Sequence, residues 1–359
     1  MRTLILILLL WASTAAQALT ISRSPNRQEQ LLLVDAKDGR FDLPLFEAAL
    51  IASHASPDEL QTLRARHDEL VVEAQRLTNE AQSKLEAASA IFTMMHATVL
   101  SGHYRAESTS LVDALQTGDF NCVSATILFQ TLTTPCGLTV TPVATPSHVY
   151  CRLSDDQDFD IQTTCPDWFD YMDRPELQRA AMRRTPGWSP DNEPRELTSV
   201  QLIGKIYYNR GVFLLNDELF AAAETNFLQS MQLDRIDASA QENLLATWNN
   251  WALAKCSQEK FEEASQLLLA GIQHDPLYGP FQMNDLHVHQ RWAQALCKQG
   301  KFEAASQLLK SCQKRRPDVK SFEESRKAVH HLWRVQRTRN LERATSAGLH
   351  PPRPRGLSI

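Results

Sequence analysis

The stretch that decides the fold class is residues 117–164, TGDFNCVSATILFQTLTTPCGLTVTPVATPSHVYCRLSDDQDFDIQTT. A turn opens it, and the apolar residues of 123–132 then recur at helical spacing. Gly137 ends that helix, and polar residues separate the last two of the segments that follow, as in a hairpin. The segments with strand character are 138–143, 148–153 and 159–164. One helix followed by three strands predicts an α+β domain.

Three side chains of this stretch are suited to catalysis by a thiol nucleophile. Cys122 opens the predicted helix, where free backbone amides and the helix dipole favour a thiolate. His148 begins the second predicted strand and is placed to take the thiol proton. The imidazole then needs an acceptor that fixes its tautomer and orientation. Asp160 on the next strand carries a carboxylate, so the sequence predicts a triad of Cys122, His148 and Asp160.

Gln162 is the alternative to Asp160 as the orienting group. The two residues are two positions apart on one predicted strand and therefore face the same side. A carboxylate stabilises an imidazolium better than an amide does, which favours Asp160, but an amide oxygen can also orient the ring. Taken singly, the candidates have ordinary structural interpretations: a core cysteine, a hydrogen-bonded histidine and a solvated aspartate.

Residues 118–165 resemble the transglutaminase-like core, a branch of the papain-like cysteine enzymes. The matching features are Cys122 at a helix start, Gly137-Leu138, the strand that begins at His148, and the run 160–164. Strict alignment with the family's Asp-Pro-Thr run puts Gln162 at the acid position. The resemblance implies an enzyme that acts on peptide or side-chain amides through a thioester, by hydrolysis, deamidation or acyl transfer. It implies an oxyanion held by the Cys122 backbone amide and a second donor that is not identified.

The residues before this core read as helices over 41–100. Ser56 followed by Pro57 and two acidic residues is typical of a helix start. These helices resemble the N-terminal region of SirB1-type proteins, a group that also joins a transglutaminase-like fold to tetratricopeptide repeats. The matching stretches are 45–51, 57–60 and 110–111. Many members of that group lack the Cys, and this chain keeps it.

A repeat with a period of 41 residues occupies the C-terminal part of the chain. Phe220, Phe261 and Phe302 are spaced by that period, and Ala223, Ala264 and Ala305 keep the same step. Each unit reads as two helices joined by a short turn before the Phe, with the alanine allowing the second helix to approach the first. The pattern resembles the tetratricopeptide repeat, whose period is 34. The extra length predicts longer loops between repeats, such as 277–285. The resemblance implies a surface for proteins or peptides; alternatively the stack only scaffolds its neighbouring domain.

The N-terminus has the features of an export signal. Arg2 precedes an unbroken apolar run over 4–12, and small residues follow up to Ala16-Gln17-Ala18. This order predicts a signal peptide over 1–18, with cleavage after Ala18. Nine apolar residues are too few to span a bilayer, and no later segment is long and apolar enough. We therefore expect a periplasmic or secreted protein without a membrane span.

The composition argues against a nucleic-acid-binding protein, a cofactor- or metal-binding protein and a disulfide-rich protein. The chain has 359 residues with 37 basic against 42 acidic side chains, so it lacks the basic excess of a nucleic-acid-binding protein. Its twelve glycines form no phosphate-binding loop, and no CxxC or HExxH occurs, so we expect neither a cofactor nor a metal. Seven cysteines are too few for a disulfide scaffold, although Cys151 and Cys165 could pair if their strands face each other.

These patterns predict an order of parts along the chain. They are a signal peptide (1–18), N-terminal helices (19–100), a transglutaminase-like core (101–172), a linker (173–200), three tetratricopeptide-like repeats (201–318), a capping helix (319–345) and a disordered tail (346–359). Two functions are compatible with this order. The first is an exported cysteine enzyme with a repeat domain that binds proteins or peptides. The alternative is a non-catalytic binding scaffold in which the repeats carry the function.

Overall fold

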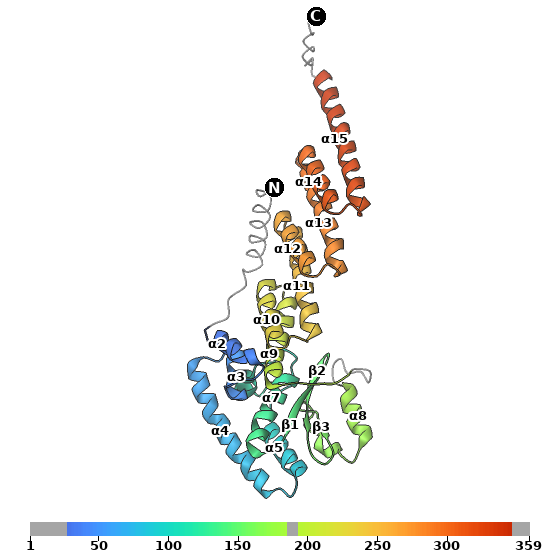
Figure 1. Cartoon of the computed structure of the whole chain (residues 1–359). Helices are drawn as coiled ribbons and strands as arrows, with labels where there is room; N and C mark the ends of the chain where they lie inside the picture. Colours follow the sequence, from blue (N-terminus) through green and yellow to red (C-terminus); the bar gives the residue numbers. More distant parts are fainter. Residues whose placement is uncertain (1–26, 185–192, 347–359) are drawn as a thin grey trace, which may run out of the picture. The chain divides into compact units, whose positions relative to one another are not determined.

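The computed structural model describes residues 27–184 and 193–346 (Figure 1). The predicted signal peptide and the tail beyond Ser346 lie outside the described residues, as does the middle of the predicted linker. The chain divides into two compact units. We call the described residues up to Thr247 the sheet unit and those from Trp248 the repeat unit.

A four-stranded antiparallel sheet lies in the sheet unit, and it confirms the α+β prediction. Its strands are β1 (Val140–Thr145), β2 (His148–Leu153), β3 (Phe159–Ile161) and β4 (Arg195–Glu196), in the order β3-β2-β1-β4. Strand β2 has the predicted bounds. Strands β1 and β2 form a tight hairpin in which Thr145 pairs with His148, and the next pair of strands aligns Arg152 with Asp160.

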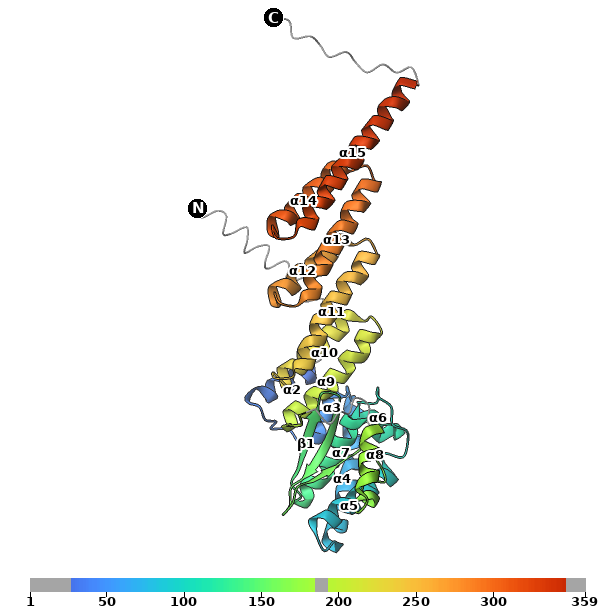
Figure 2. The same ribbon diagram turned by 90° about the vertical axis from the view of Figure 1, so that its right-hand side faces the viewer.

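Helix α7 (Cys122–Thr133) packs on β1 and β2 and forms the centre of the hydrophobic core (Figures 1 and 2). Nearly all of its side chains are buried, since α5, α3, α4 and α9 also contact it. Its polar side chains bond within the protein: Thr126 Oγ1, for example, lies 2.9 Å from Thr163 Oγ1. Helix α7 is therefore held rigidly against the strands that carry the candidate residues.

The helices predicted over 41–100 are present. The helices before α7 are α2 (Arg27–Asp35), α3 (Leu45–Ala52), α4 (Pro57–Glu80), α5 (Lys84–Thr98) and α6 (Leu111–Thr117). The start of α4 is the predicted one: Ser56 Oγ accepts from the Glu59 amide, and Glu59 Oε2 accepts from the Ser56 amide at 2.8 Å. Short 3-10 turns occur at Ala36–Asp38, Thr134–Cys136 and Phe169–Tyr171.

The segment predicted as a linker, 173–200, is structured on both sides of its undescribed middle. It contains α8 (Pro175–Arg184), which begins at a proline, where the missing amide costs nothing. It also contains β4, which pairs with β1. The four prolines of this segment indicated a linker, but prolines at a helix start and beside an edge strand are compatible with structure.

The first helix pair of the 41-residue repeat belongs to the sheet unit. Helices α9 (Ser199–Asn216) and α10 (Phe220–Leu233) place Ile203, Ile206 and Tyr207 in the same hydrophobic core as α7 and β2. The division between the two units falls within α11 (Ala238–Ser257), not at the predicted linker.

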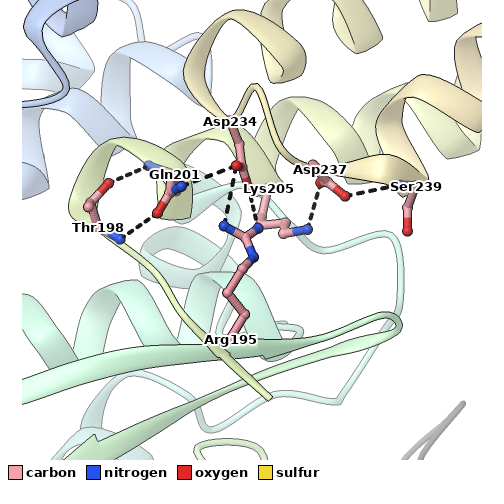
Figure 3. A network of polar contacts seen from close by, with 7 residues as sticks. All are labelled: Arg195, Thr198, Gln201, Lys205, Asp234, Asp237 and Ser239. Atoms are coloured by element: carbon pink, nitrogen blue, oxygen red, sulfur yellow. Dashed lines mark hydrogen bonds and ion pairs between the residues drawn. The ribbon is translucent and has the colours of Figure 1, made fainter. Parts of the chain in front are cut away.

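A polar network fixes this helix pair to the sheet (Figure 3). Arg195 of β4 donates to Asp234 at 2.5 Å, and Asp234 also accepts from Gln201 at 3.2 Å. Lys205 pairs with Asp237 at 2.7 Å, and both side chains are nearly inaccessible to solvent. Buried charges of this kind are costly unless paired, so the network fixes one position for α9 and α10.

The repeat register is the predicted one. Helices α10, α12 (Phe261–His274) and α14 (Phe302–Arg315) each begin at the repeated Phe and have 14 residues. The repeated alanines Ala223, Ala264 and Ala305 are fully buried. The predicted long loop at 277–285 is not present, because α13 (Gly279–Lys298) begins within it. The extra length lies in the first helix of each pair, which has 20 residues in α11 and α13. A final helix, α15 (Lys320–Ser346), lies where the capping helix was predicted.

Candidate active site

Cys122 is the first residue of α7, as the sequence predicted. Asn121 caps this helix: its Oδ1 accepts from the amide of Val123 at 2.8 Å and from that of Ser124 at 3.2 Å. A reciprocal bond runs from the Asn121 amide to Ser124 Oγ, at 3.0 Å. The cap fixes the helix start and, with it, the position of the Cys122 side chain, which is 8% exposed.

Burial raises the pKa of the Cys122 thiol, against the expectation from the sequence. The amides of Val149, Cys122 and Val123 and the ammonium of Lys205 act in the opposite direction, but they do not compensate for the lost hydration of a thiolate. The sequence argument counted the amides of a helix start as free. Asn121 already occupies two of them, and the pattern gave no measure of how deeply the sulfur is buried. The resting side chain is therefore a thiol.

His148 is the first residue of β2 and is buried, with 5% of its surface exposed. Its Nε2 lies 2.8 Å from Oε1 of Gln162. An amide oxygen only accepts, so Nε2 carries the proton and Nδ1 keeps its lone pair. Burial lowers the pKa of His148, and the bond to Gln162 opposes this only in part. The imidazole is therefore neutral at physiological pH, with one nitrogen ready to accept a proton.

The Cys122 thiol lies near the backbone at the start of β2, the strand that also carries His148. The amide of Val149, the residue that follows His148, is close enough to the Cys122 sulfur to act against the rise of its pKa. Both side chains are buried, and their elements pack on each other. A neutral thiol and a neutral imidazole with a free lone pair are the two components that a proton transfer requires.

Asp160 does not contact His148, which corrects the favoured form of the predicted triad. It forms two bonds with Arg152, from Nε at 2.7 Å and from Nη2 at 3.1 Å. The reason is the strand register, which aligns Asp160 with Arg152, four residues beyond His148. Gln162 is nearer the start of β2 and takes the orienting position instead. The sequence argument put both residues on one predicted strand, but β3 ends at Ile161 and Gln162 follows it, and the argument could not fix the register.

A pocket of about 390 Å³ opens beside His148 and Gln162. His148 and Gln162 line it together with Tyr104, and the remaining wall comes from the segment after β3 and from α8; those residues are Thr164, Cys165, Pro166, Asp167, Tyr171, Leu177, Ala180 and Ala181. Burial raises the pKa of Tyr104 to about 12, and interaction with Cys122 adds to the effect. Tyr104 is therefore a residue of the pocket wall that lies within electrostatic range of Cys122.

His96 is a residue near the site that the sequence did not single out. Its Nε2 lies 3.1 Å from the carbonyl oxygen of Thr163, the residue next to Gln162. Burial lowers the pKa of His96 to about 4, so it is neutral and can donate to that carbonyl. It helps to hold the segment that carries Gln162. A single histidine on an amphipathic helix gives no signal from which this contact could be predicted.

The structure also bears on the disulfide, the metal site and the membrane span that were considered from the sequence. All seven cysteines lie in the described residues and are present as thiols, so Cys151 and Cys165 do not form a disulfide. Cys151 faces α7, with its sulfur 3.9 Å from the Thr126 carbonyl oxygen. Within residues 27–184 and 193–346, no group of three or more His, Cys, Asp and Glu side chains could hold a metal. In the same ranges, no helix combines the length and hydrophobicity that crossing a bilayer requires.

Comparisons of the chain with protein-family models, with curated proteins and with solved structures find no match. The function is therefore inferred from the chemistry of these residues.

Proposed function

We propose that the sheet unit is a transglutaminase-like cysteine enzyme that acts on peptide or side-chain amides through a thioester. The observation that carries the proposal is the buried hydrogen bond between His148 and Gln162, on a strand whose Val149 amide interacts with the Cys122 sulfur. This bond assigns the proton to Nε2 and the basic lone pair to Nδ1.

In the proposed mechanism, Nδ1 of His148 takes the Cys122 proton as the sulfur attacks the substrate carbonyl. The carbonyl oxygen becomes an oxyanion, for which the Cys122 backbone amide is the proposed donor. The imidazolium then gives its proton to the leaving amine, which departs and leaves a thioester. Water or a second amine resolves the thioester, giving hydrolysis or deamidation in the first case and acyl transfer in the second. Because both groups start neutral, proton transfer accompanies the attack and does not precede it.

The test is the rate at which iodoacetamide labels Cys122, mapped by peptide across pH. We expect Cys122 to be the most reactive of the seven thiols despite its burial, because His148 removes its proton. His148→Ala should slow labelling at pH 7 by at least about tenfold, the scale of a lost general base. Gln162→Ala should slow it less, and Asp160→Ala, the matched control two residues away, should leave it unchanged.

The opposite outcome would favour the alternative function. If Cys122 is labelled no faster than Cys256 or Cys297, and His148→Ala changes nothing, the sheet unit is not an enzyme. The protein would then be a binding scaffold.

A specific feature of the repeat unit favours protein or peptide binding as the second function. A groove of about 600 Å³ runs along α13 and α15, with Phe302 and Leu309 of α14 in its wall and Val329 and Leu332 of α15 beside them. Lys298 and Arg339 also line it. We propose that it binds apolar peptide segments that carry acidic residues. Lys298→Glu combined with Arg339→Glu should abolish the binding of a fluorescent Leu- and Glu-rich peptide, measured by anisotropy.

We further propose that the protein is exported, because of the leader predicted over 1–18. N-terminal sequencing of protein from the source cells should begin at Leu19. Recovery of a chain that still begins with Met1 would contradict export by this leader.

A further inference from the structure

We infer that the pocket beside His148 takes substrates that carry a cationic group, an ammonium or a guanidinium, and that Asp167 binds this group. The inference names the substrate class of the proposed enzyme and so rests on the proposed function. Asp167 would be a specificity-determining residue and would take no part in the transfer of protons.

The charge of the pocket is the first argument. Among the described residues that line it, Asp167 alone carries a formal charge near neutral pH. His148 shares the lining but is neutral, as its burial requires. The remaining wall is apolar or uncharged, with Leu177, Ala180 and Ala181 contributed by α8. Asp167 itself is exposed, so solvent partly screens its charge and we expect a modest preference for cations.

The second argument is that no described cation neutralises Asp167. Arg152, a basic side chain of the sheet, is bound to Asp160. Arg179 and Arg183 on α8 are exposed and do not line the pocket. His96 interacts electrostatically with Asp167, but burial holds the pKa of that histidine at about 4, so it is neutral. The negative charge of Asp167 is therefore available to a ligand.

The third argument is that Asp167 is held in place. The hydroxyl of Tyr171 donates to its Oδ2 at 3.1 Å, and its carbonyl oxygen accepts from the Asp170 amide at 3.1 Å. Asp167 lies within a turn that is closed by the Trp168 amide, which donates to the Cys165 carbonyl at 3.0 Å, and the Trp168 indole donates to the Asp160 carbonyl at 2.8 Å. One donor leaves most of the acceptor capacity of a carboxylate unused. A cation bound there would lie in the same pocket as His148 and Gln162.

The experiment measures the charge preference of the pocket with three thiol reagents of similar size. They are 2-aminoethyl methanethiosulfonate (cationic), 2-sulfonatoethyl methanethiosulfonate (anionic) and methyl methanethiosulfonate (neutral). Rates at Cys122 are measured in the full-length Cys165→Ala protein by peptide mapping. Relative to a free thiol in solution, we expect the ratio of cationic to anionic rates to be about three- to tenfold higher, the scale of one partly screened charge.

Three substitutions identify the source of this preference. Asp167→Asn removes the charge but keeps an acceptor for Tyr171, and it should return the ratio close to that of a free thiol. Asp167→Lys should invert the preference. Asp170→Asn is the matched control: Asp170 is exposed three residues away and is not among the lining residues. It should leave the ratio unchanged.

A parallel measurement at Cys165 separates this inference from the proposed function. Cys165 lines the pocket two residues before Asp167, so in the Cys122→Ala protein it reports the charge of the pocket without the candidate nucleophile. If Cys122 is inert but the ratio at Cys165 depends on Asp167, the proposed enzyme fails and the cation-binding pocket remains. If neither thiol shows a ratio that depends on Asp167, the inference is overturned, whatever the reactivity of Cys122.

A protection assay distinguishes the two sources of a cationic group. Nα-acetyl-lysine amide carries the ammonium on a side chain, glycinamide carries it at the amino terminus, and Nα-acetyl-norleucine amide is the neutral reference. We expect at least one cationic amide to slow methyl methanethiosulfonate at the reporting thiol more than the reference does, and Asp167→Asn to remove that difference. Equal protection by all three amides would contradict cation binding at Asp167.

Discussion

Two buried histidines, one in each unit, are held by different partners and carry different charges. His148 in the sheet unit bonds to the Gln162 amide, and burial keeps its pKa below the ordinary value. His289 in the repeat unit has its Nδ1 3.1 Å from Asp285 Oδ1. Burial would lower its pKa too, but Asp285 and Cys312 raise it to about 9. The two histidines are buried to nearly the same extent, so the partner of each ring determines whether that ring is charged.

The difference shows what each arrangement is suited to. In the repeat unit, the His289 imidazolium and the Asp285 carboxylate form a fixed ion pair, with Ser265 Oγ 3.1 Å from Nε2. Both members of this pair belong to α13, and the Ser265 contact connects them to α12. The pair has no proton to exchange near neutral pH. In the sheet unit, an amide orients the ring without holding a charge on it. The lone pair of His148 therefore remains available, which is what a general base requires.

The largest effect should come from breaking the ion pair of the repeat unit. Asp285→Asn removes the carboxylate and leaves His289 with only neutral partners and Arg315, whose Nη2 lies 3.4 Å from Nε2. We expect it to cost about 3 kcal/mol, the scale at which one partner of a buried pair is lost. Denaturant unfolding and hydrogen exchange in α13 measure this cost. Asp318→Asn, an exposed position in the same unit, is the control; a comparable loss there would contradict the assignment.

Equivalent alanines test the division between the two units. Ala264→Trp should overpack α12 in the repeat unit at a cost of about 1–3 kcal/mol, without altering the labelling of Cys122. Ala223→Trp changes the corresponding alanine of α10, which belongs to the sheet unit, and should affect Cys122 labelling as well. Exposed Ala304→Trp is the control and should be nearly neutral. An unchanged melting curve for Ala264→Trp would contradict the helix-pair register.

The two units should respond to pH in opposite directions. His67 and His96 of the sheet unit have pKa values of about 4 in the folded protein, below the ordinary 6.5. Between these values the unfolded chain binds more protons than the folded one, so the sheet unit loses stability as pH falls from 6.5 toward 4. His289 has a raised pKa of about 9, so its contribution is complete below 6.5 and is lost as pH rises through 9. We expect each loss to be about 1–2 kcal/mol. Hydrogen exchange resolved by unit at pH 5, 7 and 9 would show it, and parallel changes in both units would refute it.

The smallest effect should come from giving His148 the kind of partner that His289 has. Gln162→Glu places a carboxylate beside Nε2, which should raise the pKa of His148 and favour a thiolate–imidazolium pair. Cys122 labelling at pH 6 should then be about tenfold faster, since one pKa unit corresponds to that factor. Gln162→Leu, which cannot accept a bond, is the contrasting variant and should slow labelling. Equal rates in both would show that residue 162 does not control the imidazole.

The sequence was sufficient wherever a pattern fixed an element locally. The cap at Ser56, the hairpin strand that begins at His148 and the 14-residue helices that begin at Phe220, Phe261 and Phe302 were all predictable. Each depends on contacts between neighbours in the chain or on an exact repeat. The same local reasoning placed Cys122 at a helix start.

What the sequence could not supply were the facts that depend on tertiary packing. The choice of Gln162 over Asp160 depends on strand register, and a shift of two residues leaves every side chain on the same face. The direction of the Cys122 pKa depends on burial by other elements. The assignment of α9 and α10 to the sheet unit depends on long-range contacts such as the Arg195–Asp234 pair, which no periodicity encodes.

The shortness of β4 has a consequence for self-association. Without it, Val143 and Ala144 of β1 would present unpaired backbone groups along an open edge, and such edges recruit strands from other molecules. Two residues of β4, Arg195 and Glu196, cover these backbone groups. The Leu197 amide adds one further bond, to the Pro142 carbonyl at 2.8 Å. The position of β4 depends on the anchor from Arg195 to Asp234. A protein cut just before residue 195, or one with Arg195 replaced by alanine, would therefore be prone to aggregate through β1, even though every residue of the candidate site is intact.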